Sequence, residues 1–151
     1  MSRRNEYEDV DDLFKDLAND LEDSMRNGVD KKVKQIYKSH AEQSYREYSP
    51  KYPNASRYRR GESGSFADED NFKEQVEVNG DTLTYTLENH RETDCDCAYC
   101  RSKRIRIDQY IENGIAGRSR IKAKLVYEQA QKQIDSEIEN IIINELTNKG
   151  W

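Results

Sequence analysis

Cysteine is nearly absent from this chain of 151 residues, and its three cysteines all fall between positions 95 and 100. An odd number of cysteines argues against a disulfide framework and favours a protein that works in a reducing compartment. Apolar side chains are also scarce, because hydrophobic residues make up 34% of the chain and charged residues 36%. A core built from so few apolar residues is thin, so we expect much of the surface to lie in water or against partner subunits.

The chain also lacks long hydrophobic runs and the common catalytic patterns. No stretch approaches the roughly 18 apolar residues of a transmembrane helix, and the first residues contain no apolar run of the kind that targeting signals need. There is no glycine-rich phosphate-binding loop, and the two histidines, His40 and His90, offer no convincing nucleophile pair. We therefore expect no membrane segment and no enzymatic activity.

The formal net charge of -5 is distributed unevenly along the chain. The stretch from Arg3 to Asp23 is mostly acidic, whereas residues 46–60, 101–106 and 118–124 are basic. Such segregation predicts complementary faces, either between neighbouring copies or toward an anionic partner. Ten tyrosines against three phenylalanines indicate the same, because an amphipathic ring suits an interface.

Two long helices are predicted from the spacing of apolar residues. From Val10 to about Tyr48 apolar residues recur mostly three or four positions apart, which is typical of one face of a helix. Gly28 is placed to kink this helix or to split it, and Pro50 stops it. A second amphipathic helix is predicted from about Ala123 to Leu146, and the sequence NKGW closes it.

Between the helices the period of the apolar residues changes to two. Val76 and Val78 alternate with polar residues before the sequence NGD, and apolar residues alternate again over positions 83–87. An Asn-Gly pair between two alternating runs is a strong hairpin signal. A further extended piece is predicted at residues 105–107.

These elements predict one domain over residues 1–151 with an α+β fold. The long N-terminal helix and the C-terminal helix are expected to pack on a small antiparallel β-sheet. Residues 1–9 are expected to be flexible. A long central loop is predicted at residues 49–71, where Pro, Gly, Ser and Asn are frequent, and a loop that contains the cysteines is predicted at residues 89–104.

The central loop carries a pattern that is found in one protein family. The runs YREYSPKY and YRRGESGSFADEDNF resemble the signature of bacteriophage head-tail connector proteins of the tail-completion, or neck, type. Downstream, IDQYIENGI is similar to the apolar-Ile-Glu-x-Gly element of that family, with Glu112 and Gly114 at the matching places. The positions that match the signature are Tyr48, Pro50, Tyr52, Tyr58, Arg59, Arg60, Gly64, Phe66, Asp68 and Asn71.

The resemblance implies a non-enzymatic structural subunit of the virion neck, assembled in the cytoplasm of the host bacterium. Six or twelve copies would form a ring between the portal or adaptor proteins and the tail proteins, around a channel through which DNA passes without sequence-specific binding. Head-to-tail contacts build such a ring, and segregated charge suits them. The resemblance places eight residues in the assembly loop: Tyr48, Pro50, Tyr52, Tyr58, Arg59, Arg60, Asp68 and Asn71.

The cysteine stretch offers four donors of the kind that zinc binds tetrahedrally, namely His90, Cys95, Cys97 and Cys100. Cys97 and Cys100 have the two-residue spacing of a zinc knuckle, but a structural site usually pairs two knuckles and this chain has one. Two readings therefore stay open: one structural zinc ion that pins the loop, or free thiols. No cofactor is required in either case.

Two other functions compete with the neck assignment. Basic segments near a zinc knuckle, with tyrosines that can stack on bases, suit a small nucleic-acid-binding protein, although the overall acidity opposes this. A zinc deaminase would use a His-x-Glu pattern and a downstream Pro-Cys-x-x-Cys. The chain has His40 and Glu42, but Asp96 stands where proline is required and His40 lies late in a predicted helix, so we interpret His40 as part of the helix face.

Overall fold

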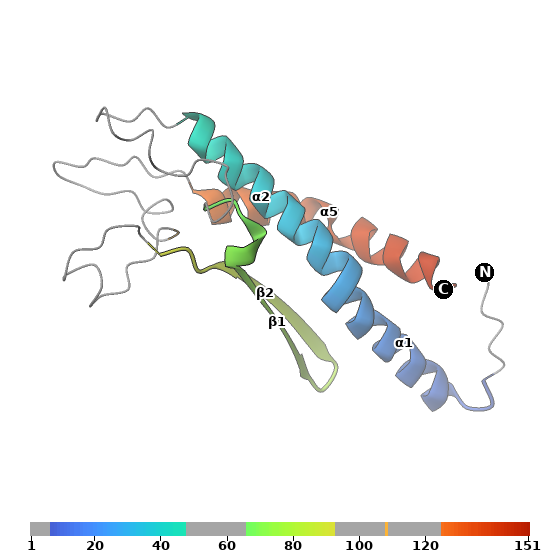
Figure 1. Cartoon of the computed structure of the whole chain (residues 1–151). Helices are drawn as coiled ribbons and strands as arrows, with labels where there is room; N and C mark the ends of the chain where they lie inside the picture. Colours follow the sequence, from blue (N-terminus) through green and yellow to red (C-terminus); the bar gives the residue numbers. More distant parts are fainter. Residues whose placement is uncertain (1–6, 48–65, 93–107, 109–124) are drawn as a thin grey trace, which may run out of the picture.

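The computed structural model describes residues 7–47, 66–92, 108 and 125–151, which form two long helical segments and one β-hairpin (Figure 1). The predicted extended piece at residues 105–107 and most of the central and cysteine-containing loops lie outside these residues. No helix within the described ranges is both long and apolar enough to span a membrane.

The N-terminal helical segment is a rod in three parts: α1 (Val10–Ser24), a π-helical turn (Met25–Val29) and α2 (Asp30–Glu47). The rod begins at a cap, because the side chain of Asp9 accepts a hydrogen bond from the backbone N–H of Asp11 at 3.2 Å. The predicted long helix is therefore confirmed, and it runs as one diagonal rod across the molecule (Figure 1).

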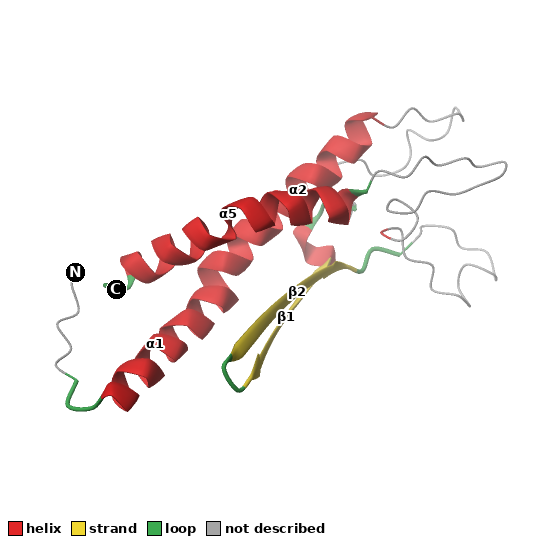
Figure 2. Cartoon of the chain, turned by 180° about the vertical axis from the view of Figure 1, so that it is seen from behind, coloured by secondary structure: helices red, strands yellow, loops and turns green. Residues whose placement is uncertain are grey.

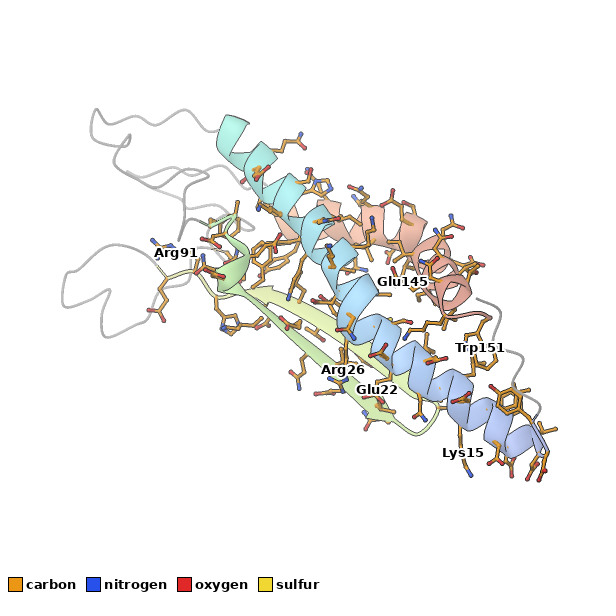
Figure 3. All side chains as sticks on the ribbon, turned by 45° about the vertical axis from the view of Figure 1, so that its right-hand side comes forward. Lys15, Glu22, Arg26, Arg91, Glu145 and Trp151 are labelled. Atoms are coloured by element: carbon orange, nitrogen blue, oxygen red, sulfur yellow. The ribbon has the colours of Figure 1, made fainter. Side chains whose placement is uncertain are left out.

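The break that the sequence predicted at Gly28 is also confirmed, because Gly28 lies inside the π-helical turn. A β-carbon built at Gly28 would come within 2.0 Å of a side-chain oxygen of Glu145 on the C-terminal helix. A methyl group and the carboxylate cannot share this space, so a side chain at this position would require the end of the Glu145 side chain to move. Figure 3 shows Glu145 on the side of its helix that is turned to the rod.

The predicted hairpin is confirmed as an antiparallel pair, β1 (Phe72–Asn79) and β2 (Thr82–Asn89). Its turn consists of Gly80 and Asp81, and Gly80 has a positive φ of 62°. A positive φ at the first of two turn residues is the type II′ geometry, which matches the twist of the strands. The Asn of the NGD sequence is thus the last residue of β1, and the turn follows it.

The register of the hairpin gathers its apolar side chains on one face. Val76 lies opposite Tyr85, and Val78 lies opposite Leu83. A slip by one residue would move one strand's apolar set to the other face, so the pattern of period two fixes the pairing. The opposite face is polar and carries four side chains from each strand: Lys73, Gln75, Glu77 and Asn79 from β1, and Thr82, Thr84, Thr86 and Glu88 from β2.

The C-terminal helix α5 runs from Val126 to Asn148. It begins three residues later than predicted, because Leu125 has a left-handed φ of 49° that no helix tolerates. At its end the N–H of Gly150 donates to the carbonyl of Thr147 at 3.0 Å, and the N–H of Trp151 donates to the carbonyl of Leu146 at 3.1 Å. This is a Schellman motif, and it confirms the predicted closure by NKGW.

The helices lie on one side of the molecule and the hairpin on the other, which confirms the α+β fold (Figure 2). Two small groups of buried apolar side chains hold the layers together. The larger group consists of Tyr37, Ala41, Phe66, Ala67, Phe72, Val126 and Ala130. The smaller group is Met25, Val29 and Val33. A hollow of about 240 Å³ remains between β2 and the helices.

Candidate functional site

Two of the eight predicted assembly residues, Asp68 and Asn71, lie in the described part of the chain, and the other six lie outside it. Asp68 caps a short 3₁₀ turn, since its side chain accepts a hydrogen bond from the N–H of Asp70 at 3.0 Å. The carbonyl of Asn71 accepts a hydrogen bond from the N–H of His90 at 2.8 Å. Both residues therefore shape the entry into β1, and their predicted contact with a neighbouring subunit stays a prediction.

A hydrogen-bond network centred on the buried Asn89 lies at this end of the hairpin, and we call it the root network (Phe66, Asn89, Arg91, Asp108 and Tyr127). Asn89 is fully buried, and its amide donates to the carbonyl of Phe66 at 2.6 Å. Its side-chain oxygen accepts from the N–H of Arg91 at 3.0 Å, and its own N–H donates to the hydroxyl of Tyr127 at 2.8 Å. Tyr127 in turn donates to the carboxylate of Asp108 at 2.8 Å. Asn89 is thus the hub of the network.

A cluster of aromatic rings lies beside the root network. The ring of Tyr37 lies 5.0 Å from that of Phe72, 5.2 Å from that of Tyr127 and 6.2 Å from that of Phe66, measured between centroids. Burial raises the pKa of Tyr127 to about 12, and its hydrogen bond to Asp108 adds to this rise. Burial also raises the pKa of Tyr37 far above its usual range. The hydroxyl of Tyr37 is buried without a hydrogen-bond partner among the described residues.

The root network fixes the points at which three long segments leave and rejoin the fold. Residues 48–65 end at Phe66, residues 93–107 lie between β2 and Asp108, and residues 109–124 lead into α5. Together these segments hold twelve Lys and Arg against four Asp and Glu, which is a net charge of +8. They also contain the predicted residues Tyr48 to Arg60 and all three cysteines. The fold therefore gathers the roots of its basic segments at one end.

Phe66 is the residue of this end that sequence reasoning misplaced. It was assigned to the central loop, yet it is 2% exposed and belongs to the larger buried group. A signal was present, because Phe66 and Ala67 form the one apolar pair just before the acidic turn that caps β1. The predicted cysteine-containing loop likewise begins too early at residue 89, because Asn89 is the last residue of β2.

The predicted zinc donors lie mostly outside the described residues, which include only His90 of the four. The side chain of His90 is exposed, and its Nε2 atom lies 2.9 Å from a carboxylate oxygen of Glu88. A histidine that donates one ring nitrogen to a carboxylate presents the other nitrogen for a metal, so this arrangement fits the predicted role. Within the described ranges no three His, Cys, Asp or Glu side chains are gathered to hold a metal ion.

His40, the residue that a deaminase would need, lies in α2 and faces α5. Its Nε2 atom lies 2.8 Å from the side-chain oxygen of Gln133. This contact ties the two helices together, in agreement with the interpretation of His40 as part of the helix face.

The opposite end of the molecule is formed by α1, and it differs in both exposure and charge. Val10 and Phe14 are 62% and 61% exposed. They lie on the same apolar side of the helix as Leu21, which is partly buried farther along the rod. Residues 8–23 hold eight Asp and Glu against one Lys. Figure 3 labels Lys15 near this end and Arg91 at the other end, with the length of the rod between them.

The α1 end is held by contacts with the residues that follow α5. The indole N–H of Trp151 donates to Asp20 at 2.8 Å, and the ring of Trp151 stacks on that of Tyr7 at 6.4 Å (Figure 3). The ammonium group of Lys149 bonds to Asp23, and this bond holds the pKa of the Asp23 carboxyl below its usual range. Residue 7 falls in the stretch expected to be flexible, yet its hydroxyl also donates to Asp16 at 2.7 Å.

A group of four polar side chains joins the hairpin to the rod midway between the two ends. The hydroxyl of Tyr85 donates to Asp30 at 2.5 Å, and the ammonium group of Lys34 lies 3.0 Å from Asp30 and 2.9 Å from Glu74. Burial lowers the pKa of Lys34, but its hydrogen bonds with the two carboxylates outweigh this and raise it overall. The same hydrogen bond from Lys34 lowers the pKa of Glu74.

Fold and charge together define a small α+β protein in which residues that border three basic segments lie at one end and an exposed, acidic helix lies at the other. Residues 9–149 match the YomN family, and the chain belongs to it. The name of this family is phage-derived, so the chain is a phage-related protein. No match was found among curated proteins or among solved structures.

Proposed function

We propose that this protein is a structural subunit of the phage virion neck. Copies of it assemble into a ring that joins the portal or adaptor proteins of the head to the tail proteins, and DNA passes through the channel of the ring. The subunit acts by assembly, requires no cofactor, and is put in place in the cytoplasm of the host bacterium.

The observation that carries this proposal is the root network. A fully buried asparagine with three hydrogen bonds is a costly arrangement, which is retained where a precise local geometry is needed. Here it fixes the roots of three long segments that are basic and rich in tyrosine and arginine. Tyrosine and arginine are enriched at the energetic centres of interfaces, so a rigid support for such segments suits a subunit that binds neighbours.

The family gives the proposal its biological setting, because a phage-related protein of this size is expected to act on the virion or on the phage life cycle. In a neck ring Tyr52, Tyr58, Arg59 and Arg60 would anchor each subunit to the next. Asp68 and Asn71 would act indirectly by shaping the end of the same segment.

The proposal is tested by the mass of the native complex. The purified full chain is analysed by native mass spectrometry and sedimentation, alone and mixed with the portal and tail proteins of the same phage. We expect a six-fold or twelve-fold species, formed either alone or on the portal. A chain that stays monomeric in all of these mixtures contradicts the proposal.

A second candidate, a small nucleic-acid-binding protein, is favoured by the net charge of +8 on the segments that share the root network. Phosphate contacts make binding steeply dependent on salt. Tight binding of single-stranded DNA or RNA that weakens at least about tenfold between 50 and 200 mM salt would support this candidate. Zinc measured on the same sample at one ion per chain would assign the cysteines a structural role in either function.

A further inference from the structure

We infer that the exposed apolar stripe of α1 is a docking surface for a second copy of this chain, and that the occupant is the basic Tyr/Arg segment at residues 48–60 of that copy. The inference rests on the proposed assembly of the protein and adds the surface on which the neighbouring subunit sits. We call this surface the α1 stripe (Val10 and Phe14).

The α1 stripe is a helix face without a partner in the described fold. Its helix is strongly amphipathic in sequence, and farther along the rod the same face is covered, since isoleucines of α5 pack on the group that Leu21, Met25 and Val29 form. Toward the start of the helix the cover ends, and Phe14 keeps 61% of its surface in water. An apolar face that is buried over half its length and bare over the rest is typical of a contact completed by another molecule.

The charge around the α1 stripe selects the occupant. Residues 8–23 carry a net charge of -7, and Lys149 and Arg26, which pair with Asp23 and Glu22, reduce it to -5, so a partner that docks here should be positive. Residues 48–60 contain four Lys and Arg and no Asp or Glu, and they contain three tyrosines. Tyrosine rings can cover Val10 and Phe14 while the guanidinium groups pair with the carboxylates that flank the stripe.

The segment cannot reach the stripe of its own subunit. At 1.5 Å per helical residue, Val10 lies about 55 Å along the rod from the end of α2 and about 40 Å from Tyr37. Phe66, where the segment rejoins the fold, packs against Tyr37. A path from Glu47 to Val10 and back to Phe66 is thus about 95 Å, whereas 18 residues span at most about 65 Å. Contact between residues 48–60 and the α1 stripe therefore requires two copies of the chain.

A contact between opposite ends of two copies is heterologous, which is the kind of contact that closes rings. The acidic end of one subunit receives the basic segment of the next, and the same contact repeats around the ring. Each subunit contributes its basic segment to one neighbour and its α1 stripe to the other neighbour.

The contact is tested by photo-crosslinking in the full chain. A benzophenone amino acid is placed at position 14, and this protein is mixed with ¹⁵N-labelled wild type so that crosslinks between copies are recognised by mass. We expect crosslinks from position 14 to residues 48–60 of the labelled copy. The same probe at Asn19, on the opposite face of α1, is expected to give none.

The energetic test compares Phe14→Gln with Asn19→Gln by sedimentation. We expect Phe14→Gln to raise the concentration needed for half-assembly at least about tenfold, because exposed aromatic anchors dominate small interfaces. Asn19→Gln should assemble as the wild type does, and 1 M salt should weaken assembly of both wild type and control.

The outcomes separate the inference from the proposed function. If the wild type forms a ring that Phe14→Gln leaves unchanged, the docking surface is wrong and the neck function stands. Crosslinks from position 14 to a portal or tail protein alone refute the second copy as occupant, again without harm to the neck function. If no ring forms alone or with the portal, both fail.

Discussion

The two ends of this molecule differ in how they treat side chains: polar groups are buried at one end, and apolar groups are exposed at the other. At the root network, polar groups are taken out of water and each is given a partner within the subunit, apart from the hydroxyl of Tyr37. At the start of α1, apolar groups are left in water and have no partner in the described fold. Folding of the single subunit therefore satisfies the hydrogen bonds of the root network, whereas the apolar surface of α1 is covered only when a further molecule binds.

The sharpest way to break this comparison is to remove the hub of the root network. Asn89→Ala removes the buried hydrogen bond to the carbonyl of Phe66 and the partly buried one from the N–H of Arg91. We expect the free energy of unfolding to fall by about 2–4 kcal/mol, measured by urea denaturation. The control Asn79→Ala, at the exposed tip of the hairpin, should change it by less than about 0.5 kcal/mol. Equal effects of the two variants would refute the role of the hub.

Tyr127 and Tyr37 allow a comparison between a hydroxyl group that has hydrogen-bond partners and a buried one that has none among the described residues. Tyr127→Phe removes a hydroxyl that binds Asp108 and Asn89, and we expect it to lower the free energy of unfolding by about 1–2 kcal/mol. Tyr37→Phe removes a buried hydroxyl without a partner among the described residues, so this variant should be neutral or more stable by up to about 1 kcal/mol. Thermal melts of both variants decide the point, and a loss at position 37 as large as that at position 127 would contradict it.

The middle of the rod provides a test of packing between the helices. Gly28→Ala places a methyl group where the carboxylate of Glu145 lies, but alanine favours a helical backbone by about 1 kcal/mol. We expect the single variant to be near neutral or slightly destabilised. In a Glu145→Ala background the same change should stabilise by about 0.5–1 kcal/mol, because the clash is gone. Additive effects in this double-mutant cycle would show that the two side chains do not compete.

The joint between hairpin and rod is expected to depend weakly on pH. The pKa of Glu74 is lowered in the folded protein, so its contribution is present above the ordinary value of 4.5 and is lost as the pH falls through the lowered value. Glu74 is partly exposed, and we expect a loss of about 0.5 kcal/mol between pH 6 and pH 3 that Glu74→Gln removes. Glu77→Gln, on the polar face of the same strand, is the control. A pH profile that Glu74→Gln leaves unchanged would contradict this assignment.

The contacts between hairpin and rod should also weaken as the pH rises into the alkaline range. The pKa of Tyr85 is raised by burial and by its hydrogen bond to Asp30, and that of Lys34 is raised as well. A raised pKa stabilises the fold below the unfolded value, and this contribution is lost as the pH rises. Stability should therefore decline above about pH 10, the ordinary value for tyrosine.

The smallest effect on stability is expected at the α1 stripe, where the effect on assembly should be largest. Phe14→Gln removes an aromatic ring that lies mostly in water, and glutamine is at least as good a helix former as phenylalanine. The free energy of unfolding of the monomer should change by less than about 0.5 kcal/mol, measured by urea denaturation at low protein concentration. A large loss would mean that Phe14 is part of the core.

The sequence was sufficient for the elements because their signals are local. The spacing of three and four residues predicted both helices, and the period of two around the NGD sequence predicted the hairpin. Gly28 was correctly placed as a break, although its reason, the carboxylate of Glu145, lies more than a hundred positions away. Local patterns therefore predict the type of an element and its approximate position, and they do not predict which elements it contacts.

The root network was beyond the reach of the sequence for a physical reason. Asn89 binds Phe66 across 23 positions and Tyr127 across 38 positions, and no periodicity connects residues at such separations. Asparagine and tyrosine at strand and helix ends are ordinary surface residues by composition, so nothing marks them as buried. The segregation of charge was visible in the sequence, but the fold was needed to place the acidic helix and the residues that border the basic segments at opposite ends of the molecule.

The contact between Tyr7 and Trp151 gives the protein a spectroscopic reporter of its own. Trp151 is the single tryptophan of this chain, and it is 38% exposed beside the acidic face of α1. Its emission depends on how much water surrounds the indole, and its stacking on Tyr7 and its bond to Asp20 hold it in one environment. Light emitted by this one residue can therefore follow events at the start of the rod in real time, without any dye attached to the subunit.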